Sequence, residues 1–199
     1  MPDDREGRDK QARDEENRQR LRAMLEELER GDEAEPPVDD GELDEIESDL
    51  GAVDYPATGA AVVETVGDRE IDSTEGAYTV AELLPDSDAE TFDSPEAVRL
   101  RVQRPTIAAA MKRVVEATES LQPSGVRGSQ REAYERTLRE LRDVDAVDDD
   151  EGIETMADWI VERIEAKGEL PGSRDVRRQG AKIARESGYE VRNDEWLGV

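Results

Sequence analysis

The sequence predicts an α+β protein that is predominantly helical, and three observations support this fold class. Apolar residues recur at helical spacing in most segments, as they do in residues 107–118. Two short runs, 69–72 and 77–79, flank the turn sequence STEG and predict one small β-hairpin. Helix start signals are frequent, and the clearest is Ser94-Pro95, which combines a capping hydroxyl with proline at the first helical position.

Residues 43–121 are expected to form a small α+β module. Leu43, Ile46 and Leu50 lie on one face of a predicted first helix. Thr58 is placed to cap a second helix, and the hairpin follows that helix. Pro105 should interrupt or restart the last helical stretch, because proline removes a backbone hydrogen bond inside a helix.

Residues 1–42 form an acidic tail that is expected to be partly disordered. Within it, residues 8–30 place four apolar side chains on one helical stripe: Leu21, Met24, Leu25 and Leu28. A stripe this short needs a partner to persist as a helix. It is either a helix that docks into the groove of a partner protein or a tail that keeps the chain in solution.

Two segments follow the module. Residues 122–152 are expected to be a linker with one helix, opened by a capping box at Ser129 and Glu132. Residues 153–199 predict a helix-turn-helix-like unit. Its first helix stops at Gly168, the sequence Leu-Pro-Gly turns the chain, and Ser173 is expected to cap the second helix.

The second of these helices has two opposed faces. Its cations fall within about 80° of one another at 100° per residue: Arg174, Arg178, Lys182 and Arg185. The opposite side carries Val176, Gly180, Ile183 and Ala184. A turn followed by a basic helix predicts possible contact with nucleic acid. The alternative is a solvated face whose charges are balanced by nearby acids.

Charge and composition point to a cell that accumulates salt. The chain has 53 acidic and 27 basic residues, a formal charge of −26, and four lysines. Such a charge makes a folded chain repel itself in dilute buffer, whereas about 1 M salt shortens the Debye length to roughly 3 Å. We therefore expect a halophilic cytoplasmic protein. The alternative is an acidic disordered chain.

Several classes of function lack their residues or motifs. There is no Cys and no His, so thiolate and imidazole chemistry are excluded. No phosphate-binding glycine loop, dinucleotide fingerprint or nucleophile elbow occurs, and no apolar run is long enough to span a bilayer. We expect no catalytic activity, no cofactor, no metal site and no membrane association.

The basic residues concentrate in the middle of the chain. Residues 99–142 carry 10 basic and 5 acidic side chains, whereas both flanking regions are acidic. Its first cations are Arg99, Arg101, Arg104, Lys112 and Arg113. They should dock against the acidic regions of the same chain or an acidic partner, and the alternative is a nucleic-acid contact.

One part of the chain resembles a known family. The motifs GELDEIES, DYPAT, VGDREI, AYTVAELL and ETFDSPEAVR, within residues 41–103, resemble a haloarchaeal family of short acidic proteins to which no activity is assigned. The resemblance implies a small α+β unit and no reaction. The amino-terminal helix and everything after about residue 121 are additions to that pattern, and they could carry the function specific to this chain.

These observations favour a non-catalytic binding or regulatory protein with a protein partner. The alternative is a DNA-binding regulator that uses residues 153–199. Salt limits that alternative, because neutralising four phosphates gives a slope of about −3.6 in log K against log salt. Between about 0.2 M and 4 M salt the affinity would fall by nearly five decades, so four charges alone could not hold DNA.

Overall fold

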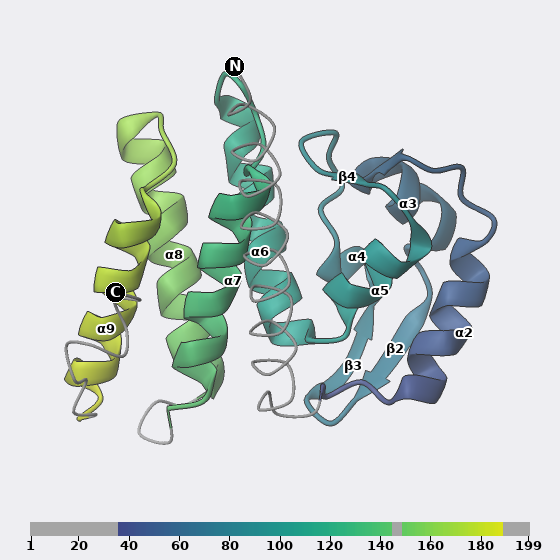
Figure 1. Ribbon diagram of the computed structural model, residues 1–199, viewed down its shortest axis with the longest axis horizontal. Coiled ribbons are helices and arrows are strands. Elements are labelled where there is room, and N and C mark those ends of the chain that lie inside the picture. The colour runs from purple at the N-terminus through teal and green to yellow at the C-terminus, as the bar shows by residue number, and fades with distance from the viewer. Residues whose placement is uncertain (1–35, 145–148, 189–199) are drawn as a thin grey trace, which may run out of the picture. The chain divides into compact units, whose positions relative to one another are not determined.

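The computed structural model describes residues 36–144 and 149–188 (Figure 1). The predicted residues Leu21, Met24, Leu25 and Leu28 and the last eleven residues lie outside this range. In chain order the elements are α2 (Asp40–Leu50), β1 (Ala57–Thr58), α3 (Gly59–Val66), β2 (Glu70–Ser73), β3 (Gly76–Thr79), α4 (Val80–Leu83), β4 (Thr91–Phe92), α5 (Pro95–Val102), α6 (Pro105–Ala117), η1 (Thr118–Ser120), α7 (Gly128–Arg142), α8 (Asp149–Lys167) and α9 (Ser173–Glu186). The fold is α+β and mostly helical, which confirms the predicted class.

The strands form two antiparallel pairs. The expected hairpin is present as β2 and β3, in a register that pairs Glu70 with Thr79 and Ser73 with Gly76. The pairing of β1 with β4 was not expected, because the two strands have two residues each and 32 residues separate them. Strands so short give no alternating pattern in the sequence.

Local signals placed most helix starts correctly. Ser94 Oγ accepts a hydrogen bond from the Ala97 backbone N–H, and Thr58 Oγ1 accepts one from Ala61. The chain ends α5 at Val102 and begins α6 at Pro105, as the proline predicts. Serine and threonine hydroxyls at these positions satisfy backbone donors that the first turn leaves without partners.

Two predicted caps are wrong. The residue before α7 is Arg127 and the residue before α9 is Gly172, so Ser129 and Ser173 lie inside their helices and cap neither. The start of α9 is fixed from another element instead. Tyr134 Oη and Gln130 Nε2, both on α7, donate hydrogen bonds to the Pro171 carbonyl oxygen at 2.5 and 2.9 Å.

The first hydrophobic core lies within the amino-terminal half of the described chain. It contains the three residues predicted for the first helix together with side chains from α3, α4 and α5 and the hairpin: Val38, Leu43, Ile46, Leu50, Ala57, Val62, Ile71, Val80, Leu83, Leu84, Phe92, Val98, Val102 and Ala108. Packing begins earlier than the expected boundary at residue 43. Val38 is 3% exposed and pairs with Ser73 beside the hairpin.

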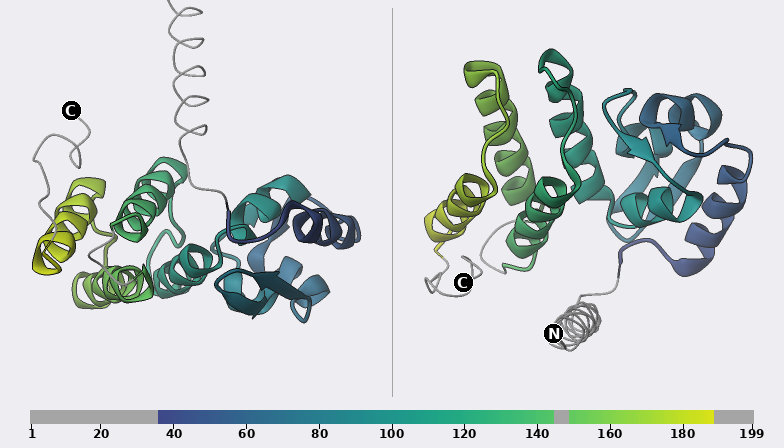
Figure 2. Two further views of the ribbon diagram at one scale, coloured as in Figure 1. Left: turned by 90° about the horizontal axis from the view of Figure 1, so that it is seen from below. Right: turned by 45° about the horizontal axis from the view of Figure 1, so that its top comes forward.

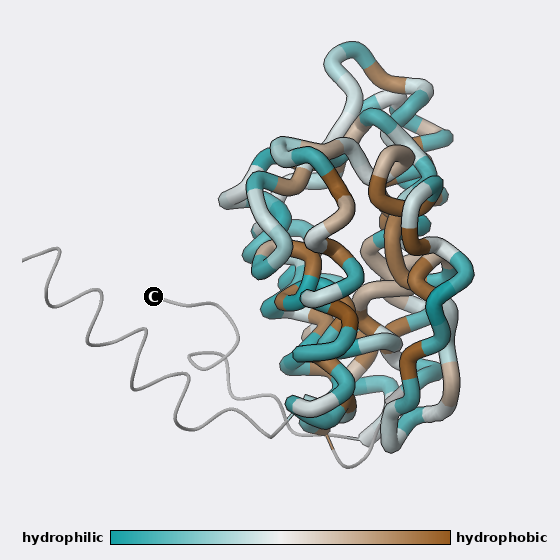
Figure 3. Tube along the Cα trace, turned by 90° about the vertical axis from the view of Figure 1, so that its right-hand side faces the viewer, coloured by the Kyte–Doolittle hydropathy of each residue, from teal (hydrophilic) through white to brown (hydrophobic). Residues whose placement is uncertain are grey.

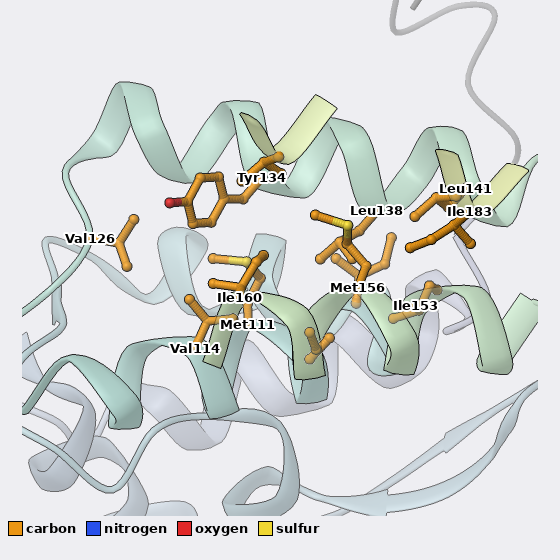
Figure 4. Close-up of a cluster of buried hydrophobic side chains, with 14 of the residues drawn as sticks. Met111, Val114, Val126, Tyr134, Leu138, Leu141, Ile153, Met156, Ile160 and Ile183 are labelled. Carbon is orange, nitrogen blue, oxygen red and sulfur yellow. The ribbon is translucent and has the colours of Figure 1, made fainter. Parts of the chain in front are cut away.

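The second core is formed by four helices, α6 to α9. Helix α6 packs on α8, α7 packs on α9, and α7 and α8 pack on each other. Helices α7 and α9 lie on one side of this arrangement, and α6 and α8 lie on the other (Figure 2, left). The buried side chains between them include Met111, Tyr134, Leu138, Met156 and Ile160 (Figure 4). On the side of the first core, which faces the viewer in Figure 3, hydrophobic positions likewise recur along the chain between hydrophilic ones.

Helix α6 belongs to both cores. Ala108 is buried in the first core, whereas Ile107, Met111 and Val114 are buried in the second. The expected division after residue 121, with the next helix in a linker, therefore does not coincide with the packing. The α7 helix has a buried face of its own, which contains Leu138 and Leu141, and this face needs α6, α8 and α9 to cover it.

Candidate binding surface on α9

The α9 helix is held in the fold by one apolar side. Val176, Gly180, Ala181, Ile183 and Ala184 are buried, and four of these five were predicted for that face. The preceding turn begins at Gly168, whose φ of 66° is a conformation that glycine adopts readily. Two α7 side chains donate hydrogen bonds to the Pro171 carbonyl in this turn. These bonds and the buried apolar side together fix how α9 is rotated about its own axis.

The opposite side of α9 is cationic and open to solvent. The four predicted residues, Arg174, Arg178, Lys182 and Arg185, are all exposed. Lys182 lies 3.7 Å from Glu186, an exposed pair on the same helix. No ion pair joins the three arginines to another residue of the described chain. The structure thus brings all four side chains to one surface, as the helical spacing predicted.

Eight cations elsewhere in the described chain form ion pairs with carboxylates. Arg69 contacts Glu42, Glu45 and Asp49, and Arg99 contacts Asp40, Asp44 and Glu47 on α2. Six further residues are paired in the same way: Arg101, Lys112, Arg113, Arg131, Arg136 and Arg142. The basic middle of the sequence therefore docks against acidic residues of its own chain, which was the favoured of its two interpretations.

The most buried of these contacts lies where the two cores meet. Glu90, before β4, is 1% exposed, and its Oε1 lies 2.8 Å from Arg101 Nη2 on α5 and 3.0 Å from Arg131 Nη1 on α7. Arg101 also contacts Glu135. Burial lowers the pKa of Arg131, and the Glu90 carboxylate opposes that effect. A buried charge is tolerated only when it is paired and hydrogen-bonded, as it is here.

A second group of arginines lies beside α9, at its seam with α7. Arg136 Nε donates to Glu140 Oε1 at 3.2 Å. Burial raises the pKa of Glu140, while the positive charges of Arg136, Arg177 and Arg139 act in the opposite direction. All three cations therefore lie within electrostatic range of one carboxylate. The sequence analysis missed Arg136 and Arg139, because they join the α9 surface only through the packing of α7 on α9.

The described residues contain no group of three or more acidic side chains arranged to hold a metal ion. Among the helices that the structure describes, none combines the length and the apolar character needed to cross a bilayer.

Comparison with known proteins addresses only the first part of the chain. Residues 37–114 match a family of unknown function (DUF5789). This family segment extends the predicted resemblance at both ends, from Pro37 before α2 to Val114 in α6, and covers less than half of the chain. No curated protein matches the chain, and no solved structure matches it. The cationic helix α9 lies outside the family segment.

Proposed function

We propose that this chain is a non-catalytic binding protein that docks an acidic partner protein against the cationic face of α9. One observation carries the proposal. In a chain with a formal charge of −26, the other concentrations of positive charge are neutralised internally, whereas Arg174, Arg178 and Arg185 project from the fold with no ion pair to a described residue. Charged residues at the rim of an interface select and orient a partner of opposite charge.

We further propose that the protein works in the cytoplasm of an organism that accumulates molar salt. The surplus of acidic over basic residues supports this, since at low salt the same charges would repel one another across the folded chain. At a Debye length of roughly 3 Å, attraction between exposed charges acts only at contact. Docking in this solvent therefore requires close and complementary surfaces.

The test compares two double variants that change the net charge equally. Arg174→Glu with Arg178→Glu alters the α9 face. Arg127→Glu with Lys167→Glu alters two exposed cations on other elements that have no ion pair to a described residue. Each full-length protein is used as bait at 2–4 M KCl, and captured proteins are quantified by mass spectrometry. We expect the α9 variant to lose a saturable partner by at least tenfold and the control variant to retain it.

Circular dichroism of both variants checks that the fold is intact. All four positions are exposed, so neither pair of substitutions should alter the helix content. Equal capture by the α9 variant and the control would contradict the proposed function.

A second candidate, a DNA-binding regulator, is favoured by the placement of an exposed basic helix directly after a tight turn. The test is titration of duplex DNA at 2–4 M KCl with the wild-type chain and with Arg178→Glu, Lys182→Glu. A regulator would bind tightly and lose affinity in the variant. Absence of binding, or an affinity that the variant leaves unchanged, would eliminate this candidate.

A further inference from the structure

Leu100 is the large hydrophobic side chain that the described part of the chain leaves exposed, with 64% of its surface open to solvent. It lies on α5 between Arg99 and Arg101, on the side opposite the buried residues Val98 and Val102. A single exposed leucine is common in folded proteins and needs no explanation by itself. Leu100 is informative because of the cavity that it borders.

Leu100 borders a cavity of 140 Å³ between α5, the start of α6, and α7. Its apolar lining comes from Leu100, Ile107 and Ala108, and its polar lining comes from Arg101, Gln103, Arg104, Glu135 and Arg139. The cavity is open on one side and close in volume to one that holds a benzene molecule, so it can receive the end of one aliphatic side chain beside its apolar residues. We call it the Leu100 socket.

The Leu100 socket and the cationic face of α9 are connected. Arg139 lines the socket and also acts on Glu140, together with Arg136 and Arg177 at the α7–α9 seam. Helices α5, α7 and α9 lie on the same side of the described unit (Figure 2, left). One surface therefore runs from the Leu100 socket, over the exposed side of α7, to the exposed cations of α9.

We propose that this whole surface binds one acidic segment of a partner protein, which seats an aliphatic side chain in the Leu100 socket, crosses α7, and places its carboxylates on the exposed cations of α9. The inference rests on the proposed function and identifies the chemistry of the partner. Burying one aliphatic side chain strengthens a complex about tenfold or more, and this contribution does not depend on charge screening. It supplies the attraction that exposed charges lose in molar salt.

The same surface suits a protein better than a nucleic acid. Glu135 lines the socket, and Glu140, also on α7, accepts a hydrogen bond from Arg136. A phosphate backbone running along this surface would meet both carboxylates, whereas a protein segment can place a neutral or basic side chain opposite each. Phosphate contacts also weaken steeply as salt rises.

The experiment introduces a photo-cross-linking amino acid, p-benzoylphenylalanine, into the full-length chain at position 100 or at position 175, which is exposed on α9 and keeps its cations. Both proteins are irradiated in a lysate of the source organism at 2–4 M KCl, and the cross-linked peptides are identified by mass spectrometry. We expect both positions to cross-link one partner protein, through neighbouring segments rich in Asp and Glu. Different proteins at the two positions would overturn the inference, and so would nucleic acid at both.

The partner identified in this way is then purified, and its affinity is measured for the wild-type chain and for Leu100→Ser. The matched control is Ala52→Ser, which also replaces an exposed apolar residue and lies after α2, outside the socket. We expect Leu100→Ser to weaken binding about tenfold or more and Ala52→Ser to leave it unchanged. Because Leu100 is exposed, its substitution leaves the cores intact.

The outcomes separate the two proposals. If Arg174→Glu with Arg178→Glu abolishes binding but Leu100→Ser does not weaken it, the extended surface is wrong and the proposed function stands. If neither variant weakens binding, or if neither chain carrying p-benzoylphenylalanine cross-links a protein, the proposed function is wrong as well.

Discussion

The arginines at the junction of the two cores and those on α9 come from one cation-poor chain, yet their surroundings differ. Arg101 has 9% of its side chain exposed and contacts carboxylates from two other elements, whereas Arg174 and Arg178 are exposed. Removing a paired, buried charge leaves its partner uncompensated, but removing an exposed one changes little. The junction arginines therefore stabilise the fold, whereas the α9 arginines are exposed and contribute little to it.

The largest expected effect comes from breaking the junction. Glu90→Gln removes the negative charge that compensates Arg101 and Arg131, and we expect it to lower the free energy of unfolding by about 3–5 kcal/mol. Urea unfolding in concentrated KCl, followed by circular dichroism, measures this value. The control, Asp158→Asn, removes the exposed partner of Arg113 and should cost under about 1 kcal/mol. A similar loss of unfolding free energy in both variants would show that the buried junction stabilises the fold no more than an exposed ion pair does.

A second substitution tests the backbone contact at the same junction. Gly125 has a φ of 90°, and a Cβ added there would lie 2.3 Å from the Ala89 carbonyl oxygen. We expect Gly125→Ala to cost about 1–3 kcal/mol in unfolding experiments. Gly128→Ala, at the start of α7, meets nothing within 4 Å and should be neutral or slightly stabilising. A neutral Gly125→Ala would mean that the two loops can separate without loss.

Tyr134 links α7 to the turn before α9 and provides a test that depends on pH. Burial raises the pKa of Tyr134 to about 12, above the value near 10 of an exposed tyrosine. Between pH 10 and 12 the unfolded chain releases this proton while the folded chain keeps it, so the free energy of unfolding falls as pH rises.

Tyr134→Phe should remove this part of the pH dependence. At neutral pH it should cost about 1 kcal/mol, because Gln130 still donates to the Pro171 carbonyl. Unfolding curves for both proteins at pH 8, 10 and 11 give the measurement. Parallel pH profiles for the wild type and the variant would contradict the assignment of this pH dependence to Tyr134.

The smallest expected effect is on α9. Replacing Arg174, Arg178 and Arg185 by glutamine should change the free energy of unfolding by less than about 0.5 kcal/mol, because all three side chains are exposed. The same variant should bind the partner at least tenfold more weakly. A large loss of unfolding free energy would show that these arginines stabilise the fold, as the junction arginines are expected to do.

Short-range patterns predicted much of the fold. The hairpin at residues 70–79, the break between α5 and α6 at Pro105, and the buried and basic sides of α9 all follow from residues within a few positions of one another. The caps at Ser129 and Ser173 were predicted wrongly from the same kind of signal. At α9, the hydrogen bonds from Tyr134 and Gln130 to the Pro171 carbonyl hold the start of the helix from a distance in sequence.

The residues of the candidate surface likewise include some that the sequence predicted and some that only the packing revealed. Arg174, Arg178, Lys182 and Arg185 could be found from the sequence because residues three and four apart share a helix face. Leu100 and Arg139 could not, since one is on α5 and the other on α7, and only the packing places both at one cavity.

The sequence by itself determined the fold class, the helix faces and the surplus of acidic residues, since each depends on composition or on neighbours along the chain. The tertiary structure alone decided which cations are neutralised and which remain exposed. It did so because an ion pair such as Glu90 with Arg131 joins residues 41 positions apart. Such a contact forms only after two hydrophobic cores have brought their elements together.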